Sequence, residues 1–275
     1  MKKIRILGDH SNLHCGCQAV MAYLHQLLDG RYQRVADGED YDILLVNGEG
    51  SMHDNAKDHK TKLNAIKAAQ DEGKQAFLIN SVWQNNNKSY NKVLQQIPSI
   101  VVREAASQRD LRLNHGIESR VRLDLSYAAA VDQTATVTDY AGAQLITDFY
   151  SKDFGGWVKF TAGGAGKARS PYIDMKKFSW SELVRSMQTA SLLVTGRHHA
   201  VFAACKARLP FVALESNTHK ISGFVSMSKL PVPVCDNPRQ LNNAIKWAKE
   251  NPAVYQEFFD FLDEQPRFTL ADIGL

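Results

Sequence analysis

Two segments of this 275-residue chain contain residue types that can move a proton next to an anion. One follows the apolar run "SLLVT" and the other follows "FVAL", with the small apolar pattern "AVFAACKA" between them. In a unit of strand, helix and strand, the two runs would be parallel strands, so the polar residues after them would lie at one edge of the sheet. The candidates are Arg197, His198, His199, Ser216, Asn217 and Lys220.

The chemistry of these residues favours a functional site. Histidine exchanges protons near neutral pH, whereas arginine and lysine hold carboxylates and phosphates. A lone histidine at a helix start would more often be a cap or a solvated residue, but here histidine lies beside Arg197 and opposite Lys220. We expect His198 and His199 at the rim of the site, and the sequence leaves open which of them transfers the proton.

Glycine-rich turns provide a second group of candidates. Three apolar runs end in the turns "LGDHSNLHCGC", "VNGEGSMH" and "VTGRHH". Ligands of open parallel sheets bind outside the carboxyl ends of the strands, and the start of a helix favours an anion. One such turn can be merely a tight connection, but three with polar neighbours favour a binding site. The first two turns contribute Asn12, Gly16, Gly48, Glu49, Gly50 and His53.

The cluster of two histidines and two cysteines between residues 10 and 17 raises the question of a metal. A structural zinc site uses four ligands, usually as two spaced pairs, and the remaining cysteines, Cys205 and Cys235, fall on an expected helix and at a strand end. We therefore expect no metal and no cofactor. Cys15 and Cys17 are interpreted as small buried residues at a helix start, and all four cysteines as reduced thiols.

The segment "GGAGKARS", from Gly163 to Ser170, resembles a phosphate-binding loop only superficially. A P-loop needs glycine at the position of Thr161 and serine or threonine at the position of Ala168. The segment is interpreted as a solvated connection, with a basic loop that covers an anion through Lys167 and Arg169 as the alternative.

Composition limits the class of protein. Hydrophobic residues make up 44% and charged residues 23%, which is typical of globular chains, and no apolar run approaches a membrane span. We expect a soluble, cytoplasmic protein without a signal peptide. The net charge of +4 is mild and Lys and Arg are dispersed, so we expect no nucleic-acid partner.

Strand and helix patterns alternate along most of the chain. Examples are the runs "IRILG", "YDILLVNG", "QAFLINS", "SIVVRE" and "SRVRLDLS" with amphipathic patterns between them. This alternation predicts an α/β fold with parallel sheets covered on both faces. Residues 132–156 lose the rhythm and could form the crossover to a second domain. We expect two Rossmann-like domains that face a cleft, 1–130 at the N-terminus and 131–275 at the C-terminus with the terminal helices.

Four segments in fixed order resemble the polysaccharide pyruvyl transferase family. The turn that contains Asn12, Gly16 and Cys17 is similar to the family's first loop, and "NGEGSMH" to its second glycine-rich loop. The segment "VVREAASQRDL" resembles the family's V-R-D/E-x-x-S-x-x-x-L pattern, and "GRHH" followed by a strand and a lysine resembles its carboxyl-terminal motif. The resemblance extends from Ile4 to Val225, apart from residues 129–181.

The resemblance implies a two-domain fold similar to that of GT-B glycosyltransferases and an enzyme that acts as a transferase. It implies transfer of a pyruvyl group from phosphoenolpyruvate to two hydroxyls of a sugar, which forms a ketal without a metal. The acceptor would be a surface glycan of the cell envelope, such as an exopolysaccharide, or its lipid-linked precursor, which would allow peripheral membrane association. The implied catalytic residues are Arg103, His199 and Lys220.

Two other functions are compatible with the same residues. A GT-B glycosyltransferase that moves a nucleotide-activated acidic sugar would place His199 and Arg197 beside the donor phosphate. A protein that only binds sugar phosphates or glycans could keep the fold without turnover. Release of phosphate, release of nucleotide, and binding without turnover distinguish the three hypotheses.

Overall fold

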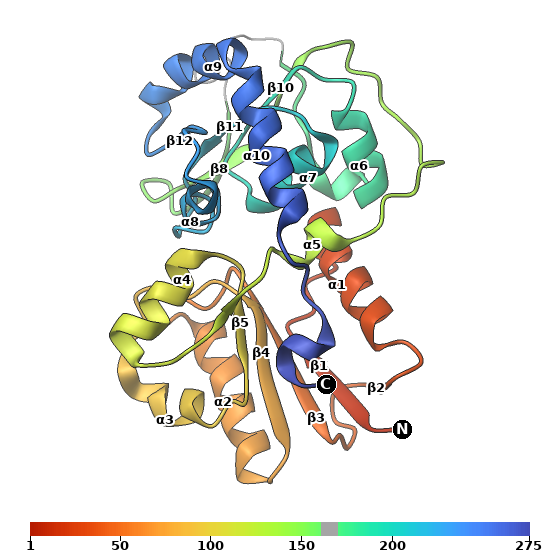
Figure 1. The fold of residues 1–275 in the computed structure, drawn as a ribbon, viewed down its shortest axis with the longest axis vertical. Helices are drawn as coiled ribbons and strands as arrows, with labels where there is room; N and C mark the ends of the chain where they lie inside the picture. The colour runs from red at the N-terminus through yellow and green to blue at the C-terminus, as the bar shows by residue number, and fades with distance from the viewer. Residues whose placement is uncertain (161–169) are drawn as a thin grey trace. The chain divides into compact units, whose positions relative to one another are not determined.

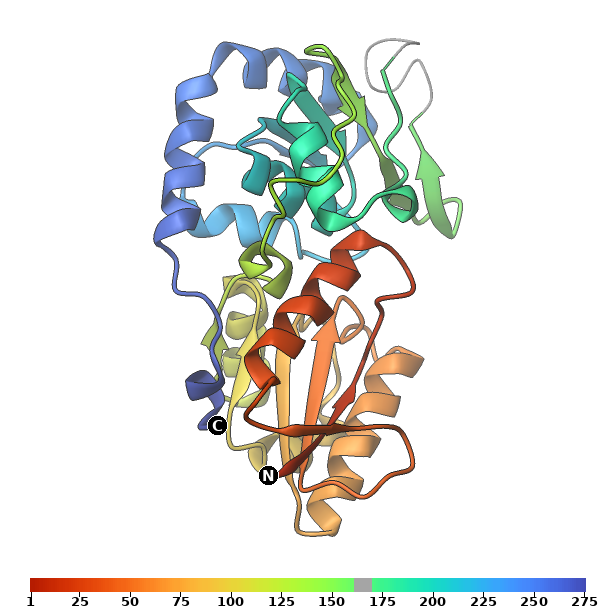
Figure 2. The same ribbon diagram turned by 90° about the vertical axis from the view of Figure 1, so that its right-hand side faces the viewer.

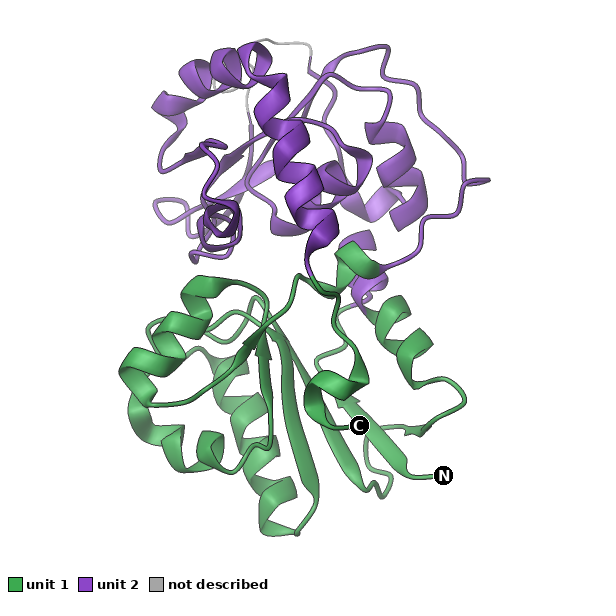
Figure 3. Cartoon of the chain, in the orientation of Figure 1, with its two compact units in different colours: residues 1–10, 21–128, 266–275 green, residues 11–20, 129–265 purple. Residues whose placement is uncertain are grey.

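The computed structural model describes residues 1–160 and 170–275. The predicted basic loop with Lys167 and Arg169 therefore lies outside the described residues. The chain divides into two compact units, shown in Figure 3. Unit 1 comprises residues 1–10, 21–128 and 266–275, and unit 2 comprises residues 11–20 and 129–265.

Unit 1 is built on a six-stranded parallel sheet in the order β2-β1-β3-β4-β5-β6. Parallel strands need crossover connections, and the intervening helices supply most of them (Figure 1). The strands are β1 (Lys3–Leu7), β2 (Gln33–Val35), β3 (Ile43–Glu49), β4 (Gln75–Ser81), β5 (Ile100–Val102) and β6 (Arg120–Val121). The helices that follow them include α1 (Cys15–Leu28), α2 (Lys57–Asp71), α3 (Asn91–Gln95), α4 (Ala105–Asp110) and α5 (Leu125–Ala128).

The core of unit 1 follows from the burial of its central strands. Every residue of β3 is buried, as expected for a parallel strand with both faces covered. Leu44 and Val46 of β3 pack with Leu63 and Ile66 of α2 in one apolar cluster. Figure 2 shows α2 on one side of the sheet and the C-terminal part of α1 on the other. The sheet is thus held between helical layers, which leaves its strand ends as the places for polar residues.

The last residues of the chain belong to unit 1. The short helix η6 (Leu270–Ile273) begins with a capping box formed by Thr269 and Asp272. Arg122 forms an ion pair with the Asp272 carboxylate, and the Ser99 hydroxyl donates to the Asp272 carbonyl at 2.9 Å. These contacts attach the tail to the residue before β5 and to the residue after β6.

Unit 2 contains a four-stranded parallel sheet in the order β12-β11-β10-β7 and an antiparallel hairpin of β8 and β9. The strands are β7 (Gln144–Ile146), β8 (Asp148–Ser151), β9 (Gly156–Lys159), β10 (Leu192–Thr195), β11 (Phe211–Leu214) and β12 (Val234–Cys235). The helices include α6 (Trp180–Met187), α7 (His198–Ala207), α8 (Ser222–Val225), α9 (Leu241–Glu250) and α10 (Pro252–Glu264). The α/β class with parallel sheets is therefore confirmed.

The structure adds strands where the sequence loses its rhythm. Strands β7, β8 and part of β9 fall within the polar stretch of residues 132–156. Each has three or four residues, which is too short for a period of two to stand out. The expected strand "SRVRLDLS" is also shorter, because only Arg120–Val121 pairs in the sheet and α5 begins at Leu125. Among the described helices, none is both long and apolar enough to cross a membrane.

His59 makes the stability of unit 1 dependent on pH. It is buried in α2 against the rings of Trp83 and Tyr90, with centroids 5.3 and 5.7 Å away. Neither of its ring nitrogens has a hydrogen-bond partner among the described residues. Burial lowers the pKa of His59 from 6.5 to about 4.

We expect the free energy of unfolding to fall as the pH drops from 6.5 towards 4, because the unfolded chain binds a proton at His59 that the folded chain excludes. The loss should reach about 3 kcal/mol at most. Urea unfolding of the wild type and of His59→Phe across this range measures it. A pH profile of His59→Phe that parallels the wild type would contradict the assignment.

Candidate functional site

In unit 1, buried polar groups join the carboxyl ends of three neighbouring strands. The Asn47 amide donates to the Gly8 carbonyl at 3.0 Å and to the Glu49 carboxylate at 3.1 Å. The Asn80 amide donates to the Asn47 side-chain oxygen at 3.1 Å. Gly8 has φ +92°, and a Cβ there would lie 2.3 Å from the Asn47 carbonyl oxygen. Glycine is therefore required at the end of β1 by both conformation and space.

Lys62 of α2 ties this network together. Its ammonium donates to the carbonyls of Asn47 and Gly48 at 2.8 and 3.0 Å and to the Ser51 hydroxyl at 2.8 Å. Burial lowers the pKa of Lys62 to about 8, and the nearby Glu49 carboxylate opposes this shift. The lysine thereby holds the glycine-rich turn after β3 in one conformation. The sequence analysis did not select Lys62, because it lies inside a helix pattern and away from any motif.

A cavity of about 310 Å³ opens beside Lys62 at the end of β1. Beside the apolar Ile6 and Leu7, its lining contains acidic, basic and hydroxyl groups from three segments of unit 1, which can hydrogen-bond to the hydroxyls of a ligand. Those polar residues are Asp9, His10, Asp37, Asp58, Thr61 and Lys62.

The other predicted residues of the second turn lie at the same edge. A Cβ on Gly48 would lie 2.5 Å from the Ser81 hydroxyl, so the turn after β3 packs directly on the end of β4. Glu49 is buried, whereas Gly50 and His53 are partly exposed, and His53 pairs with Asp54 at 2.8 Å. Gly48, Glu49, Gly50 and His53 are thus neighbours in one turn.

Arg103 follows β5 and is buried, with 1% of its surface exposed. One of its terminal nitrogens donates to the Asp124 carboxylate at 2.8 Å, and its Nε has no hydrogen-bond partner among the described residues. Asp124 also accepts from the Ser126 backbone N–H at 3.0 Å and from its hydroxyl at 2.7 Å. The Arg103 charge is therefore already paired inside unit 1.

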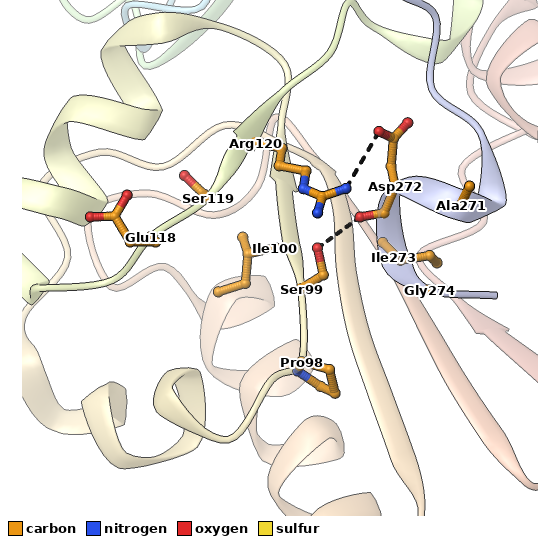
Figure 4. A pocket seen from close by; sticks show the side chains of 10 residues that line it. All are labelled: Pro98, Ser99, Ile100, Glu118, Ser119, Arg120, Ala271, Asp272, Ile273 and Gly274. Atoms are coloured by element: carbon orange, nitrogen blue, oxygen red, sulfur yellow. Dashed lines mark hydrogen bonds and ion pairs between the residues drawn. The ribbon is translucent and has the colours of Figure 1, made fainter.

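A second cavity of unit 1, of about 430 Å³, lies at the opposite edge of the sheet. Figure 4 shows it between the starts of β5 and β6 and the C-terminal tail, where Arg120 approaches Asp272 at 3.8 Å. Ligands of parallel sheets bind at the carboxyl ends of the strands. We interpret this cavity as a packing gap beside the tail.

In unit 2, Arg197 follows β10 and is fixed by the hairpin. Its guanidinium binds both carboxylate oxygens of Asp148, one of them at 2.7 Å, and stacks on the Trp157 ring 4.1 Å from the centroid. A Cβ on Gly196 would lie 2.4 Å from the Cβ of Phe149, so the turn after β10 packs directly on β8. Because residues 144–159 carried no recognised pattern, the sequence did not indicate Asp148.

His198 and His199 begin α7, and both are buried rather than at the rim, with 5% and 7% exposed. The expectation of a rim position is therefore wrong. His198 packs against the rings of Phe202 and Phe224, whose centroids lie 4.8 and 6.4 Å away. His199 instead faces the ring of His14, 5.2 Å away.

The start of α1 covers His199. A Cβ on Gly16 would lie 2.4 Å from the Cβ of His199, so only glycine allows this approach. The first turns of α1 and α7 meet here, and both helices direct their positive dipole ends to this place. Asn12, in the turn before α1, is exposed. Cys15 and Cys17 are buried free thiols as expected.

Lys220 lies in the loop after β11 with the other residues predicted there. It is buried, and its ammonium donates to the Asn217 side-chain oxygen at 2.6 Å. The Ser216 hydroxyl donates to the same oxygen at 3.2 Å. Glu215 accepts from the backbone N–H groups of Ser216 and Ser222, both at 2.9 Å, and so shapes the loop.

The predicted residues thus fall into two groups at strand ends. Unit 1 contains Arg103 and the turn 48–53, and unit 2 contains the turn 12–16, the residues 197–199 and the loop 216–220. Within unit 2 the structure brings Gly16 to His199 and Lys220 to Asn217. The sequence analysis missed two residues that hold these strand ends in place. Lys62 of α2 binds the turn after β3, and Asp148 of β8 binds Arg197 after β10.

Comparison with protein families identifies the chain. The family model of polysaccharide pyruvyl transferase matches residues 2–218. The chain belongs to the polysaccharide pyruvyl transferase family. This membership confirms the resemblance carried by the four motifs and supports a transferase. No curated protein sequence matches this chain significantly.

Several solved structures share the fold of this chain although their sequence identity with it is low. A functionally uncharacterised protein of Klebsiella pneumoniae aligns with a TM-score of 0.59 at 11% identity over 84% of this chain and 89% of its own. The glycotransferase of kitacinnamycin aligns with a TM-score of 0.55 at 11% identity over 99% and 96%. UGT2 of Phytolacca americana, complexed with UDP-2-fluoroglucose and pterostilbene, aligns with a TM-score of 0.54 at 9% identity over 96% and 94%. The fold is therefore GT-B-like.

The ion pair of Arg103 predicts a stability effect. Arg103→Ala would leave the Asp124 carboxylate buried without its cation, and breaking such a pair typically lowers the free energy of unfolding by about 3–5 kcal/mol. Urea unfolding of Arg103→Ala, Asp124→Ala and the double variant measures the coupling. A double variant that loses the sum of the two single losses would show that the pair contributes nothing.

The approach at Gly16 predicts a steric effect. Gly16→Ala should push the starts of α1 and α7 apart and lower the free energy of unfolding by about 1–3 kcal/mol, because the added methyl meets His199. Gly156→Ala is the matched control in unit 2, since a Cβ there meets no heavy atom of the described residues within 4 Å. Thermal unfolding compares the two variants. Equal effects would argue against close packing at Gly16.

Proposed function

We propose that this protein transfers a pyruvyl group from phosphoenolpyruvate to two hydroxyls of a sugar and forms a cyclic ketal. The observation that carries the proposal is the position of His199 in a chain of this family: the histidine of the "GRHH" motif lies where the starts of two helices meet. A proton-transfer group and an anion-binding environment are thus combined.

The reaction needs one proton to circulate. Protonation of the methylene carbon of phosphoenolpyruvate makes the adjacent carbon electrophilic, and a sugar hydroxyl attacks that carbon. Loss of phosphate then allows the second hydroxyl to close the ring. The two hydroxyls release two protons, of which one replaces the proton given to the methylene and the other leaves with the phosphate. In this scheme His199 donates the first proton and recovers it from a hydroxyl.

The donor carries a carboxylate and a phosphate, which require cationic partners. We assign Lys220 and Arg103 to donor binding, supported by the strand-end position of both residues. Lys220 is buried in the loop after β11, where its ammonium donates to the Asn217 side-chain oxygen. Arg103 would have to share its guanidinium with Asp124. Arg197 is held by Asp148, so we assign it to shaping the turn before His199.

The acceptor is proposed to be a sugar of a surface glycan or of its lipid-linked precursor. Sugar hydroxyls pair well with carboxylates and amides, and the end of β1 has a cavity lined with three aspartates. The turn residues Gly48, Glu49, Gly50 and His53 would lie beside such a ligand in unit 1. We propose a cytoplasmic reaction on a precursor of the exopolysaccharide or cell-envelope type, with peripheral membrane association where that precursor is lipid-linked.

Thermal unfolding with phosphoenolpyruvate, nucleoside diphosphates and nucleotide sugars tests the donor class, because a ligand that binds the folded state raises the melting temperature. Phosphate release from phosphoenolpyruvate in the presence of glycan acceptors tests the reaction. Binding of a nucleotide sugar with release of nucleotide, and no response to phosphoenolpyruvate, would favour a glycosyltransferase. Binding of phosphoenolpyruvate without turnover on any acceptor would favour a binding protein.

Two variants separate proton transfer from donor binding. His199→Gln should abolish phosphate release while phosphoenolpyruvate still binds. Lys220→Ala should weaken phosphoenolpyruvate binding roughly ten- to a hundred-fold, the usual loss for one charge-assisted contact. Lys246→Ala is the control, since that lysine is exposed on α9. Turnover of His199→Gln within a few-fold of the wild type would remove the proposed role, and the same assay on His198→Gln decides between the histidines.

A further inference from the structure

Three side chains that can bind a metal converge in unit 2. His14, Cys17 and His199 each offer a ligand atom, and these atoms all lie within 4.8 Å of one another. The Cys17 sulfur lies 3.7 Å from Nε2 of His14. Cys17 and His199 are buried, whereas His14 is partly exposed and provides the side from which an ion could enter. Among the described residues, this is the one group of at least three histidine, cysteine or carboxylate side chains that could hold a metal ion.

The spacing suits an ion with short bonds to nitrogen and sulfur. Zn²⁺ binds imidazole nitrogen at about 2.0–2.1 Å and thiolate sulfur at about 2.3 Å, so a tetrahedral ion separates neighbouring ligand atoms by roughly 3.3–3.6 Å. The pair of Cys17 and His14 is already close to this separation. The remaining separations, of at most 4.8 Å, would shorten by up to about 1.5 Å on binding. Thiolate and imidazole together favour zinc and similar soft ions over magnesium or calcium.

The charge of the ligand set is compatible with a bound cation. Metal binding itself deprotonates a thiol, so Cys17 would coordinate as the thiolate. One thiolate and two neutral imidazoles would leave a bound divalent ion with one positive charge and one open coordination position. Water or an anion could occupy that position.

Binding requires one local change. The Gly16 backbone N–H donates to Nδ1 of His14 at 3.2 Å, which leaves the proton of the neutral ring on Nε2, the nitrogen that faces Cys17. An ion at Nε2 would displace this proton to Nδ1 and break the Gly16 contact. At 3.2 Å the contact is at the long end of the hydrogen-bond range, so its loss is a small cost.

We propose that His14, Cys17 and His199 form a binding site for a single thiophilic divalent cation of the zinc class. The proposal does not depend on the pyruvyl transfer reaction, because the three ligands and their spacing are independent of any substrate. Where His199 is also the proton-transfer residue, a bound ion would occupy that side chain and inhibit turnover. The ion would then act as an inhibitor, in agreement with a reaction that needs no metal.

Cobalt binding tests the site directly. The wild-type protein, reduced and freed of metal, is titrated with Co²⁺, and the absorption of the thiolate-to-cobalt charge transfer is recorded. Equilibrium dialysis with Zn²⁺ and elemental analysis gives the stoichiometry. We expect one ion per chain, with the charge-transfer band present and with Zn²⁺ displacing Co²⁺. Absence of the band, or less than a tenth of an ion per chain at saturation, would overturn the proposal.

Three variants identify the ligands. Cys17→Ser should abolish the band, and His14→Gln should weaken binding by roughly a hundredfold or more, beyond what loss of an outer partner costs. Cys15→Ser is the matched control two residues away, because Cys15 is also a buried free thiol but is not one of the three convergent ligands. Binding that survives both Cys17→Ser and His14→Gln, or that disappears in Cys15→Ser, would overturn the site. If Cys17→Ser does not fold, as judged by circular dichroism, His14→Gln decides.

Discussion

Gly16 has no side chain, and the cluster of His14, Cys17 and His199 in unit 2 depends on this. A Cβ at this position would overlap the Cβ of His199, so the two helix starts can meet only at a glycine. Their meeting buries His199 and turns it towards His14 and Cys17. It also brings the positive dipole ends of two helix N-termini to one place, which favours an anion there. The proposed proton transfer and the proposed metal site both follow from this single contact.

Unit 1 uses the same device at its strand ends. Gly8 and Gly48 let backbone segments approach Asn47 and Ser81 more closely than any side chain would permit. The carbonyls exposed by these turns are then satisfied by a buried ammonium, that of Lys62. Hydrogen bonds from a charged donor are stronger than those between neutral groups, so the several bonds of Lys62 hold this turn firmly.

Ion pairs fix the arginines that sequence motifs single out. Arg103 is bound to Asp124 and Arg197 to Asp148, and the Asp124 carboxylate is itself anchored by the Ser126 hydroxyl. Charge-assisted bonds of this kind hold an arginine in a fixed orientation. The two acids thereby set the geometry of the arginines that follow β5 and β10.

The sequence by itself determined the α/β class, the succession of the main strands along the chain, and the family. It could do so because hydrophobic periodicity and short motifs are local properties of the chain. It also determined that the glycine-rich turns after β1, β3 and β10 carry polar residues at the ligand edge of a parallel sheet. Strands of three or four residues, such as β7 and β8, escaped it because so short a segment shows no period. Only the tertiary structure decided that His199 is buried, that Lys62 and Asp148 belong to the strand-end networks, and that His14 and Cys17 acquire a third partner. Those contacts join residues far apart in the chain, and their distances depend on how helices pack, which no local pattern encodes.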